Sequence, residues 1–420
     1  MKPWMIGLCA LIVAAALCLT LILLTTPSTP DVPTNPSTSA PGITTQPTSP
    51  SEPFYGVRIY QCDPKLAEKW EILADRYTAA TGVSVTIITV EDECEDALPN
   101  YLDDPFAPTI FCLHHGYDVN TYGDYCLDLT GSVIADAVLG QDIFTLPMGD
   151  AIAGVAGNVE SYGILYNSKL LADAGFTISD ITDYQSLMDV VAHITANSKK
   201  LGFSAFAAPD LTSTDHGSQL CLLAGMTHSD TSLRDVWDGY IANCSKTGNA
   251  LLQAKPGDGL KDFTSGKAVF YLGGSWEYEN LNKIQDYFLG MIPVYTPENG
   301  SQLGLHHSCT AFWCVNAKAD PINQALALDF LGWLVTAGED GLAPADSLEI
   351  LTPYKDTVYA GNPLEQLVLQ SMTNSNNVHW NSCDDLSPEV LSRFGQALLA
   401  YYKKPNDETW AAVIAARNGT

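Results

Sequence analysis

The sequence predicts an α/β fold with two lobes, and three observations support this prediction. Near its start the chain alternates between short apolar strands and amphipathic helices, which is the pattern of a helix-covered parallel sheet. The same alternation returns further along the chain. The length of 420 residues exceeds what one simple core holds, so a second lobe is expected.

The first predicted elements lie between residues 57 and 113. Residues 57–62 alternate as a strand, and Asp63 followed by Pro64 predicts the start of a helix. That helix is expected to end at Gly82. Its apolar face consists of Leu66, Trp70, Leu73 and Tyr77. The elements predicted after this helix are a strand over 83–90, a helix within 91–104 and a strand over 108–113.

Three later helices are predicted from their starts and their apolar faces. Thr182 and Gln185 have the spacing of a capping box, a second helix covers 322–337, and Ser387-Pro388 begins a third. The residues expected to face the core are Leu187, Val190, Val191 and Ile194, then Leu326, Phe330, Trp333 and Leu334, then Leu391, Phe394 and Leu398.

Residues 1–53 are predicted to lie outside the folded body. The uncharged run 6–24 is long enough to span a bilayer, which favours an uncleaved anchor over a cleaved signal peptide. Lys2 before this run orients the body toward the outside of the membrane. Residues 25–53 are rich in Thr, Ser and Pro, so they are predicted to form an extended linker.

The charge balance restricts the partners. The formal net charge is −28, and removing Lys2, Asp31 and Glu52 with the N-terminal segment leaves 19 basic and 46 acidic residues in the body. A surface of that sign repels phosphate backbones and anionic lipid, which disfavours nucleic acid as a partner. It places no restriction on a neutral ligand.

Nine cysteines lie in the body, an odd number without a CxxC spacing, which disfavours a structural zinc site. Most are expected to be plain buried residues, and the sequence leaves open whether some of them form disulfides. The nine are Cys62, Cys94, Cys112, Cys126, Cys221, Cys244, Cys309, Cys314 and Cys383.

Several stretches resemble the family 1 extracellular solute-binding proteins, the sugar receptors of ABC importers that include the maltose-binding proteins. They follow the family's order and span most of 57–340. The stretches are KLAEKWEILADRYTAATGVSVTI (65–87), VESYGILYNSKLLADAGF (159–176), ITDYQSLMDVVAHI (181–194), DFTSGKAVFYLGGSWEYENL (262–281), GMIPVY (290–295) and TAFWCVNAKADPINQALALDFLGWLV (310–335).

This resemblance implies a two-lobed, type II periplasmic-binding-protein-like fold. Each lobe is expected to be a helix-covered, mainly parallel sheet, with a ligand cleft between the lobes and closure by hinge motion. Residues 54–160 and 291–335 are expected to form lobe 1, and residues 161–290 and 336–420 lobe 2.

The resemblance also implies a carbohydrate ligand, which needs an aromatic plate and planar polar groups. Trp276 is expected to stack on the sugar and Glu160 to accept hydrogen bonds from its hydroxyls. Core packing for the aromatic residues, helix capping for Asp63 and a solvated carboxylate for Glu160 are the plainer alternatives. The other expected contacts are Gln61, Asp63, His114, His115, Tyr162 and Trp380.

The stretch AGNVESYGILYN (156–167) permits three interpretations: a catalytic loop, a core strand or a hinge that carries a ligand contact. The resemblance favours the hinge, with Glu160 facing the cleft. Tyr162, Ile164 and Tyr166 alternate as the strand that follows, and Asn167 or Ser168 is expected to cap the next helix.

Two other interpretations concern metal binding and catalysis. The histidine pairs 114–115 and 306–307 suggest a metal, but no carboxylate spacing completes a ligand shell, so neither metal nor cofactor is predicted. The thiaminase I family shares the two-lobe fold and uses a cleft cysteine, for which Cys62 or Cys112 with Glu160 or Glu277 is a candidate set.

The sequence therefore predicts a monomeric extracytoplasmic protein, held at the membrane by its N-terminal segment, that binds a carbohydrate and catalyses no reaction. Its predicted partners are that ligand and the permease subunits of an ABC importer. A binding protein for a non-sugar solute is the remaining alternative.

Overall fold

The computed structural model describes residues 54–91, 94–214, 218–225, 230–281, 289–298, 304–358, 361–373, 378–379 and 386–419. The predicted anchor and linker over 1–53 and the candidate contact Trp380 lie outside these residues. Within the described ranges, no helix is both long enough and apolar enough to cross a membrane.

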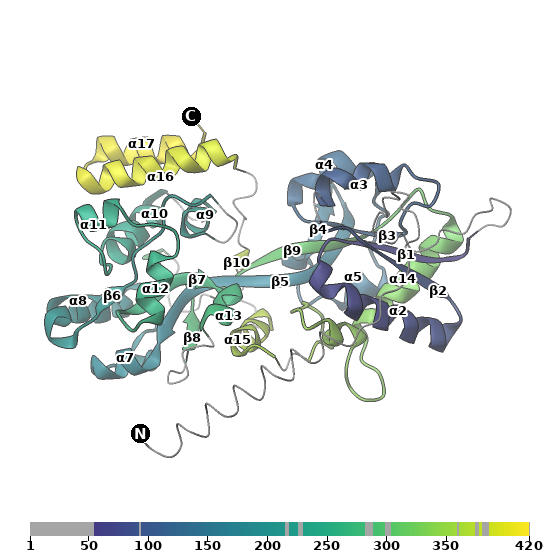
Figure 1. Ribbon diagram of the computed structural model, residues 1–420, viewed down its shortest axis with the longest axis horizontal. Coiled ribbons are helices and arrows are strands. Elements are labelled where there is room, and N and C mark those ends of the chain that lie inside the picture. The colour runs from purple at the N-terminus through teal and green to yellow at the C-terminus, as the bar shows by residue number, and fades with distance from the viewer. Residues whose placement is uncertain are drawn as a thin grey trace, which may run out of the picture. The chain divides into compact units, whose positions relative to one another are not determined.

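The described strands form one sheet whose central order is β2-β1-β3-β9-β5-β7-β6, with β4, β8 and β10 paired at its sides. Figure 1 shows β6 and β7 among one group of helices, β1, β2 and β3 among another, and the long strands β5 and β9 running between the two groups. The strands are β1 (Gly56–Gln61), β2 (Ser84–Thr89), β3 (Ile110–Leu113), β4 (Thr145–Met148), β5 (Ala151–Asn167), β6 (Ser204–Phe206), β7 (Ala268–Gly274), β8 (Leu289–Ile292), β9 (His306–Val315) and β10 (Val378–His379).

Helices connect and cover these strands. In the first half of the chain they are α2 (Ala67–Thr81), α3 (Cys94–Leu102), α4 (Val119–Tyr122), α5 (Val133–Ala137), α6 (Gln141–Phe144), α7 (Ser168–Asp173) and α8 (Tyr184–Leu201). In the second half they are α9 (Gln219–Ala224), α10 (Asp230–Val236), α11 (Asn249–Leu252), α12 (Asp258–Thr264), α13 (Tyr278–Leu281), α14 (Pro321–Val335), α15 (Pro363–Met372), α16 (Pro388–Lys403) and α17 (Asp407–Arg417).

The sheet is mixed, with parallel strands toward both ends of the order. β1 pairs in parallel with β2 and β3, and β6 pairs in parallel with β7. The long strands β5 and β9 run antiparallel to each other and to their other central neighbours, β7 and β3. The predicted α/β class is confirmed, and the antiparallel pair in the middle joins its two parallel parts.

Local signals fix most of the helix ends. Gly82 ends α2 with a φ of 77°, Asn167 accepts a hydrogen bond from the backbone of Leu170 at the start of α7, and Ser387 caps α16. The predicted capping box at Thr182 and Gln185 is wrong by one residue. Asp183 caps α8 and pairs with Ser186, because a carboxylate is the better acceptor for the free N–H groups.

Two groups of buried residues fill the body. The first core cluster includes Val57, Trp70, Phe111, Trp313 and Phe330, and the second includes Tyr162, Leu187, Phe206, Trp237 and Phe394. The predicted lobe division remains a prediction. The structure adds that Leu348, Leu351 and Tyr354 belong to the first cluster, whereas Leu391, Phe394 and Leu398 belong to the second.

The stretch 156–167 lies within one continuous strand and forms no loop. Val155 and Val159 of β5 pack in the first cluster, and Tyr162, Ile164 and Tyr166 pack in the second. Its register against β9 shifts on either side of Asn158. A β-bulge of this kind bends a strand locally while the pairing continues. The glycines and the asparagine of this stretch therefore fit into the strand without interrupting it.

Candidate functional site

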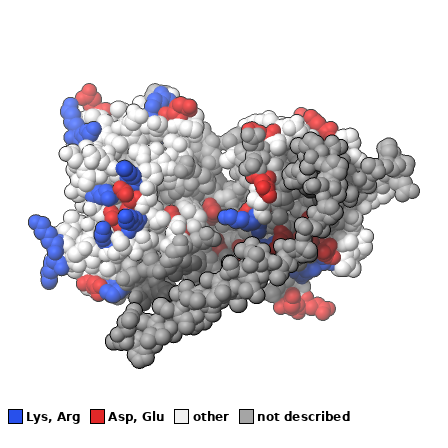
Figure 2. Space-filling model, in the orientation of Figure 1, with Lys and Arg blue, Asp and Glu red and all other residues white. Residues whose placement is uncertain are grey.

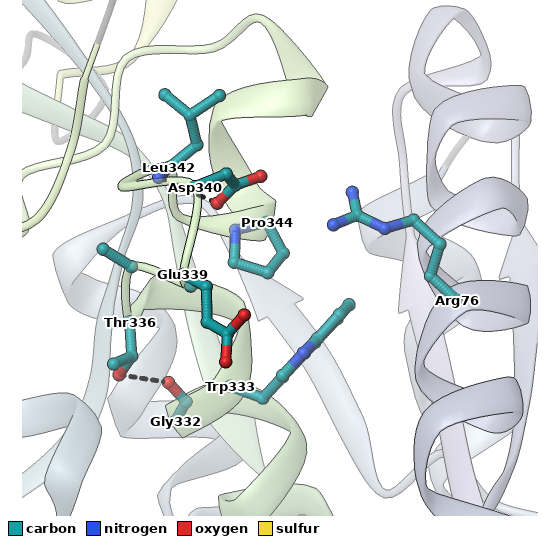
Figure 3. A pocket seen from close by; sticks show the side chains of 10 residues that line it. Arg76, Gly332, Trp333, Thr336, Glu339, Asp340, Leu342 and Pro344 are labelled. Atoms are coloured by element: carbon teal, nitrogen blue, oxygen red, sulfur yellow. Dashed lines mark hydrogen bonds between the residues drawn. The ribbon is translucent and has the colours of Figure 1, made fainter.

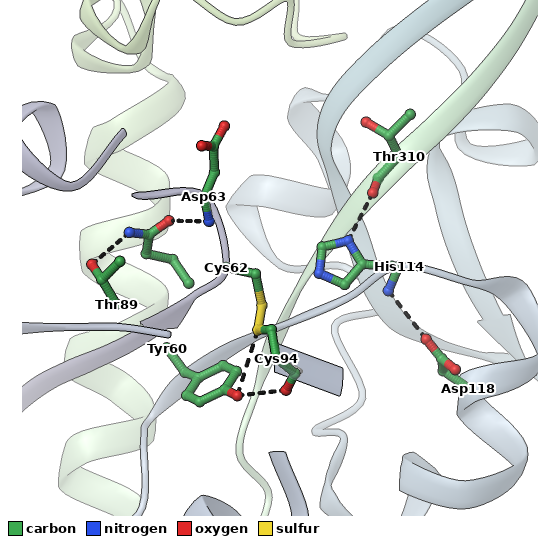
Figure 4. The surroundings of a disulfide bond; sticks show 9 residues. Tyr60, Cys62, Asp63, Thr89, Cys94, His114, Asp118 and Thr310 are labelled. Atoms are coloured by element: carbon green, nitrogen blue, oxygen red, sulfur yellow. Dashed lines mark hydrogen bonds between the residues drawn. A yellow bond between two sulfur atoms is a disulfide. The ribbon is translucent and has the colours of Figure 1, made fainter. Parts of the chain in front are cut away.

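A cavity of about 230 Å³ lies at the carboxyl ends of β1 and β3, where ligands of parallel sheets are commonly held. It brings together three of the predicted contacts, Gln61, Asp63 and His114. Figure 4 shows Asp63 and His114 near the disulfide of Cys62. The other lining residues are Cys62, Leu66, Trp70, Cys112, Gly157, Asn158, Thr310, Ala311, Trp313 and Ile350.

Gln61 holds a fixed amide group at the end of β1. Its Nε2 donates to Thr89 Oγ1 at 2.6 Å, and its Oε1 accepts from the backbone N–H of Asp63 at 2.8 Å. These two bonds set the orientation of the amide. One N–H and one acceptor lone pair remain for a ligand.

Asp63 lies on the exposed side of the same cavity. Its Oδ1 accepts a hydrogen bond from the backbone N–H of Lys65 at 2.9 Å, so the predicted capping role is confirmed. Capping engages one carboxylate oxygen, and a carboxylate accepts at two. The capping role and a ligand contact are therefore compatible.

His114 presents one defined nitrogen to the cavity. Its Nδ1 lies 3.0 Å from the carbonyl oxygen of Thr310, which only accepts, so Nδ1 carries the hydrogen. In the neutral ring Nε2 is then an acceptor. The backbone N–H groups of His114 and His115 both donate to Asp118 Oδ2, at 3.1 and 2.9 Å, which holds the turn after β3 in place. His115 does not line this cavity.

Asn158 and Thr310 line the cavity, and neither is a contact that the sequence predicts. Asn158 Nδ2 donates to Thr310 Oγ1 at 2.9 Å, which joins β5 to β9 beside the bulge. A polar amide two positions before Glu160, on the same side of a strand, is the signal that could have indicated Asn158.

Two tryptophans form the apolar wall. Trp313 stacks on Tyr354 with a centroid distance of 6.2 Å and an interplanar angle of 8°, and its ring meets Trp70 edge to face at 5.9 Å. Gly157 permits this packing, because a Cβ there would lie 2.6 Å from the Trp313 indole. Trp70 and Trp313 are only 3% and 2% exposed, so they wall the cavity without offering a free ring face.

The structure removes the enzyme alternative. Cys62 forms a disulfide with Cys94, with Cα atoms 5.7 Å apart, and therefore holds no thiolate. Burial raises the pKa of the Cys112 thiol to about 12, so it stays protonated near neutral pH. A nucleophilic cysteine needs the opposite shift. Glu277, the second candidate acid for such an enzyme, is buried and accepts a hydrogen bond from Asn280 at 3.0 Å.

The other predicted contacts lie further along β5 and after β7. Glu160 is half-buried opposite Ser308 of β9. The N–H of Ser161 donates to Ser275 Oγ at 3.2 Å, which places the turn carrying Trp276 beside this part of β5. Trp276 is half-buried with its ring against Gly274, where a Cβ would lie 2.0 Å from ring carbon Cζ3. Glu160 and Trp276 do not line the 230 Å³ cavity.

Tyr162 has no exposed surface and belongs to the second core cluster, with its ring 5.9 Å from that of His306. Tyr162 is therefore packed in the core, which is the plainer alternative to a ligand contact. His307 is also fully buried and hydrogen-bonds to Ser161 Oγ through Nδ1. Across the ranges that the structure describes, no group of three or more His, Cys, Asp or Glu side chains is placed to hold a metal ion.

A larger cavity, of about 600 Å³, lies between α2 and the chain after α14 and contains none of the predicted contacts. Figure 3 shows Arg76 facing Trp333, Glu339 and Asp340 across it. Arg76, Glu339 and Asp340 are exposed and make the cavity an open surface depression. We place the candidate site in the smaller cavity, because its polar groups are held in fixed directions.

Comparison with known proteins identifies a family that this chain matches. A family model described as bacterial extracellular solute-binding protein matches residues 73–365. A comparison with curated proteins finds no match.

Solved structures share the architecture at low sequence identity. The apo form of RafE from Streptococcus pneumoniae has a TM-score of 0.66 and 13% identity, covering 88% of this chain and 99% of its own. A family 1 extracellular solute-binding protein from Bifidobacterium longum subsp. infantis has a TM-score of 0.65 and 17% identity, covering 86% and 98%. The solute receptor AcbH has a TM-score of 0.66 and 14% identity, covering 87% and 97%.

These structures confirm the predicted periplasmic-binding-protein fold. The family model covers well over half of the residues, and its members are receptors that bind a solute and carry out no reaction on it. The chain therefore belongs to the bacterial extracellular solute-binding proteins.

Proposed function

We propose that this protein is the substrate-binding receptor of an ABC importer and that its ligand is a carbohydrate. The observation that carries this proposal is the cavity at β1 and β3. Gln61, His114 and Asn158 each hold a polar group in a fixed direction there, against an apolar wall of two tryptophans. Hydroxyl groups both donate and accept, so a sugar matches this mixture of an amide, an imidazole acceptor and a carboxylate.

Relatives of the same fold support the choice of ligand class. RafE has been solved in complex with raffinose, at a TM-score of 0.56 and 13% identity. AcbH is described as having an exclusive preference for β-D-galactopyranose, and an Arthrobacter globiformis relative is named for binding cyclic α-maltosyl-1,6-maltose. These are likenesses of fold, and the residues of this chain must carry the specificity.

Glu160, two residues beyond Asn158 in β5, and Trp276, in the turn after β7, complete the proposed site. Asn158 and Glu160 lie two residues apart on one side of the strand, about 7 Å along it. The Ser161–Ser275 hydrogen bond ties the Trp276 turn to the same stretch. Closure of the lobes over a sugar would place the Trp276 ring against its apolar face, which the recessed Trp70 and Trp313 do not supply.

A thermal-shift panel of mono- and oligosaccharides tests this proposal. A sugar present at 100 times its Kd should stabilise the protein by about 2.7 kcal/mol. Trp276→Ala and His114→Ala should abolish most of that shift. Phe106→Ala, which removes an exposed aromatic outside the cavity, should leave it intact. A flat response to every sugar, with a shift from another class of solute, would overturn the choice of ligand.

We also propose that residues 1–24 anchor a monomeric body outside the cell membrane through the linker over 25–53, next to the permease. The apolar run of residues 6–24 supports this proposal. The intact mass of protein purified from membranes should include Met1. A mature form that begins after residue 24 would replace the anchor with a cleaved signal peptide.

A further inference from the structure

A third cavity, of about 470 Å³, lies where the end of α8, the start of β6 and the end of α12 meet. It shares no residue with the candidate sugar site. Its charged lining residues are Lys199, Lys246, Lys267 and Asp262, and Ser204 and Ser245 add hydroxyl groups. We call it the lysine cavity.

The charge of the lysine cavity is opposite to that of the body. Three ammonium groups gather around the Asp262 carboxylate there, with Asp258 as a second carboxylate 3.5 Å from Lys246, whereas the body as a whole has 19 basic and 46 acidic residues. Figure 2 shows basic side chains gathered around a few acidic ones over the region of α8 and α12. A local excess of positive charge in so acidic a protein indicates an anionic ligand.

The backbone holds the elements of the cavity together. Gly202 ends α8 with a φ of 84°, and its N–H bonds to Ser198 O at 2.8 Å, which places Lys199 in the last turn. The N–H of Ser204 donates to Lys267 O at 2.9 Å, and the N–H of Lys267 donates to Asp262 O at 2.8 Å. The three lysines therefore come from separate segments that the fold brings to one place.

Asp262 lies near two of the ammonium groups without accepting hydrogen bonds from them. Its carboxylate is buried and accepts from Ser245 Oγ at 2.6 Å. Lys246 Nζ and Lys267 Nζ lie 3.8 and 4.0 Å from it, beyond ordinary hydrogen-bond length. Lys246 also lies 3.5 Å from Asp258.

The remaining donors point to the chemistry of the ligand. Among the residues that the structure describes, no hydrogen bond from the ammonium groups of Lys199 or Lys267 is found. Each ammonium has three N–H donors and no acceptor. Such a set matches an anionic group with several acceptor oxygens.

We propose that the lysine cavity binds a phosphate group. A phosphate presents several strong acceptor oxygens and is anionic both as a monoester and as a diester, so the single positive charge left after Asp258 and Asp262 are counted attracts it. The group has two sources that share this chemistry. One is the phosphodiester headgroup of a membrane lipid, and the other is free phosphate. This inference goes beyond sugar binding and is independent of it.

Titration calorimetry on the full-length chain in detergent micelles tests the proposal. The probes are inorganic phosphate and glycerophosphoglycerol, each compared with sodium chloride at equal ionic strength. The test variant is Lys199→Gln with Lys267→Gln. The matched control is Lys200→Gln with Lys261→Gln, which removes the same charge from neighbouring positions that do not line the cavity.

The expected result is saturable binding that the test variant weakens by about tenfold for each lysine and the control variant leaves within about twofold. Tighter binding of the diester identifies the lipid headgroup as the source, and tighter binding of inorganic phosphate identifies free phosphate. No heat beyond that of chloride would overturn the proposal. Equal weakening in both variants would do the same, since it would show general charge attraction only.

Discussion

Two strand ends carry the proposed sugar contacts, and they are built differently. At the end of β1 and β3, each polar group is tied to a distant segment: Gln61 to Thr89, His114 to Thr310 and Cys62 to Cys94. At the end of β7, Trp276 rests against Gly274 and is half-exposed. The first end is fixed before a ligand arrives, whereas the second carries a ring that can adjust.

The difference matches what each end supplies. Hydrogen bonds to sugar hydroxyls depend on direction, so their donors and acceptors gain from being held in place. Stacking on a sugar face tolerates small shifts of the ring and depends mainly on buried area. The following changes should affect the two ends unequally.

The largest effect is expected from removing the disulfide. Cys62→Ser with Cys94→Ser opens a link between residues 32 positions apart and should lower the free energy of unfolding by about 3–4 kcal/mol. Urea unfolding measures this loss. Cys62→Ser alone should lower it by nearly as much, because either change removes the link. Full stability in the double variant would show that hydrogen bonds alone fix the first end.

Gly157→Ala should cost about 2 kcal/mol in the free energy of unfolding. The added Cβ lies 2.6 Å from the Trp313 indole, which Trp70 and Tyr354 confine on its other sides. Gly116→Ala is the control, because nothing lies within 4 Å of its Cβ. Equal stability of the two variants, measured by urea unfolding, would mean that the tryptophan wall is not rigid.

The Cys112 thiol should make stability fall with rising pH. Burial raises its pKa from 9.0 to about 12, so the unfolded chain loses the proton first. The contribution of the protonated thiol to the free energy of unfolding is full below pH 9 and is lost as pH rises toward 12. At pH 10 the free energy of unfolding is lower by roughly 1.4 kcal/mol. Unfolding at pH 8 and pH 10 should show a smaller decrease in Cys112→Ala. Rapid labelling of Cys112 in the folded protein at pH 8 would contradict this.

Gly274→Ala should have the smallest effect on stability, within about 1 kcal/mol, and a clear effect on sugar affinity. The added Cβ lies 2.0 Å from the Trp276 ring, but the ring is half-exposed and can rotate away. The rotation would move the proposed stacking face. Binding equal to that of the unchanged protein, measured by calorimetry with the sugar that the panel identifies, would exclude Trp276 as the plate.

Local signals in the sequence predict most of the fold. The strand predicted over 57–62 lies one residue earlier, at Gly56–Gln61, and the helix that Gly82 ends and the helix that Ser387 begins have the predicted ends. The predicted cap at Thr182 lies one residue too early. Thr182 and Asp183 are both capping residues, and only the geometry of the structure shows that Asp183 caps the helix. The glycines and asparagine of 156–167 disfavour a strand locally, and it is the resemblance that favours a hinge there. Pairing with β7 and β9 outweighs that local preference.

The candidate site is only partly predictable from the sequence. Gln61 ends β1, Asp63 follows it and His114 follows β3, and these positions together with the resemblance indicate them. Asn158 and the two tryptophans of the wall carry no such signal, since Trp70 and Trp313 have the spacing of ordinary core residues. Tyr162 could have faced either a ligand or the core, and the structure has it fully buried.

The sequence by itself determined the α/β class and, for the elements it predicts, their order, most of their ends and their apolar faces, because these depend on residues a few positions apart. Tertiary structure alone decided that Cys62 pairs with Cys94, that Trp70 meets Trp313 and that three lysines converge in an acidic body. Those contacts join segments tens to hundreds of residues apart. They follow from the order of strands in the sheet, which is decided by how the whole chain packs.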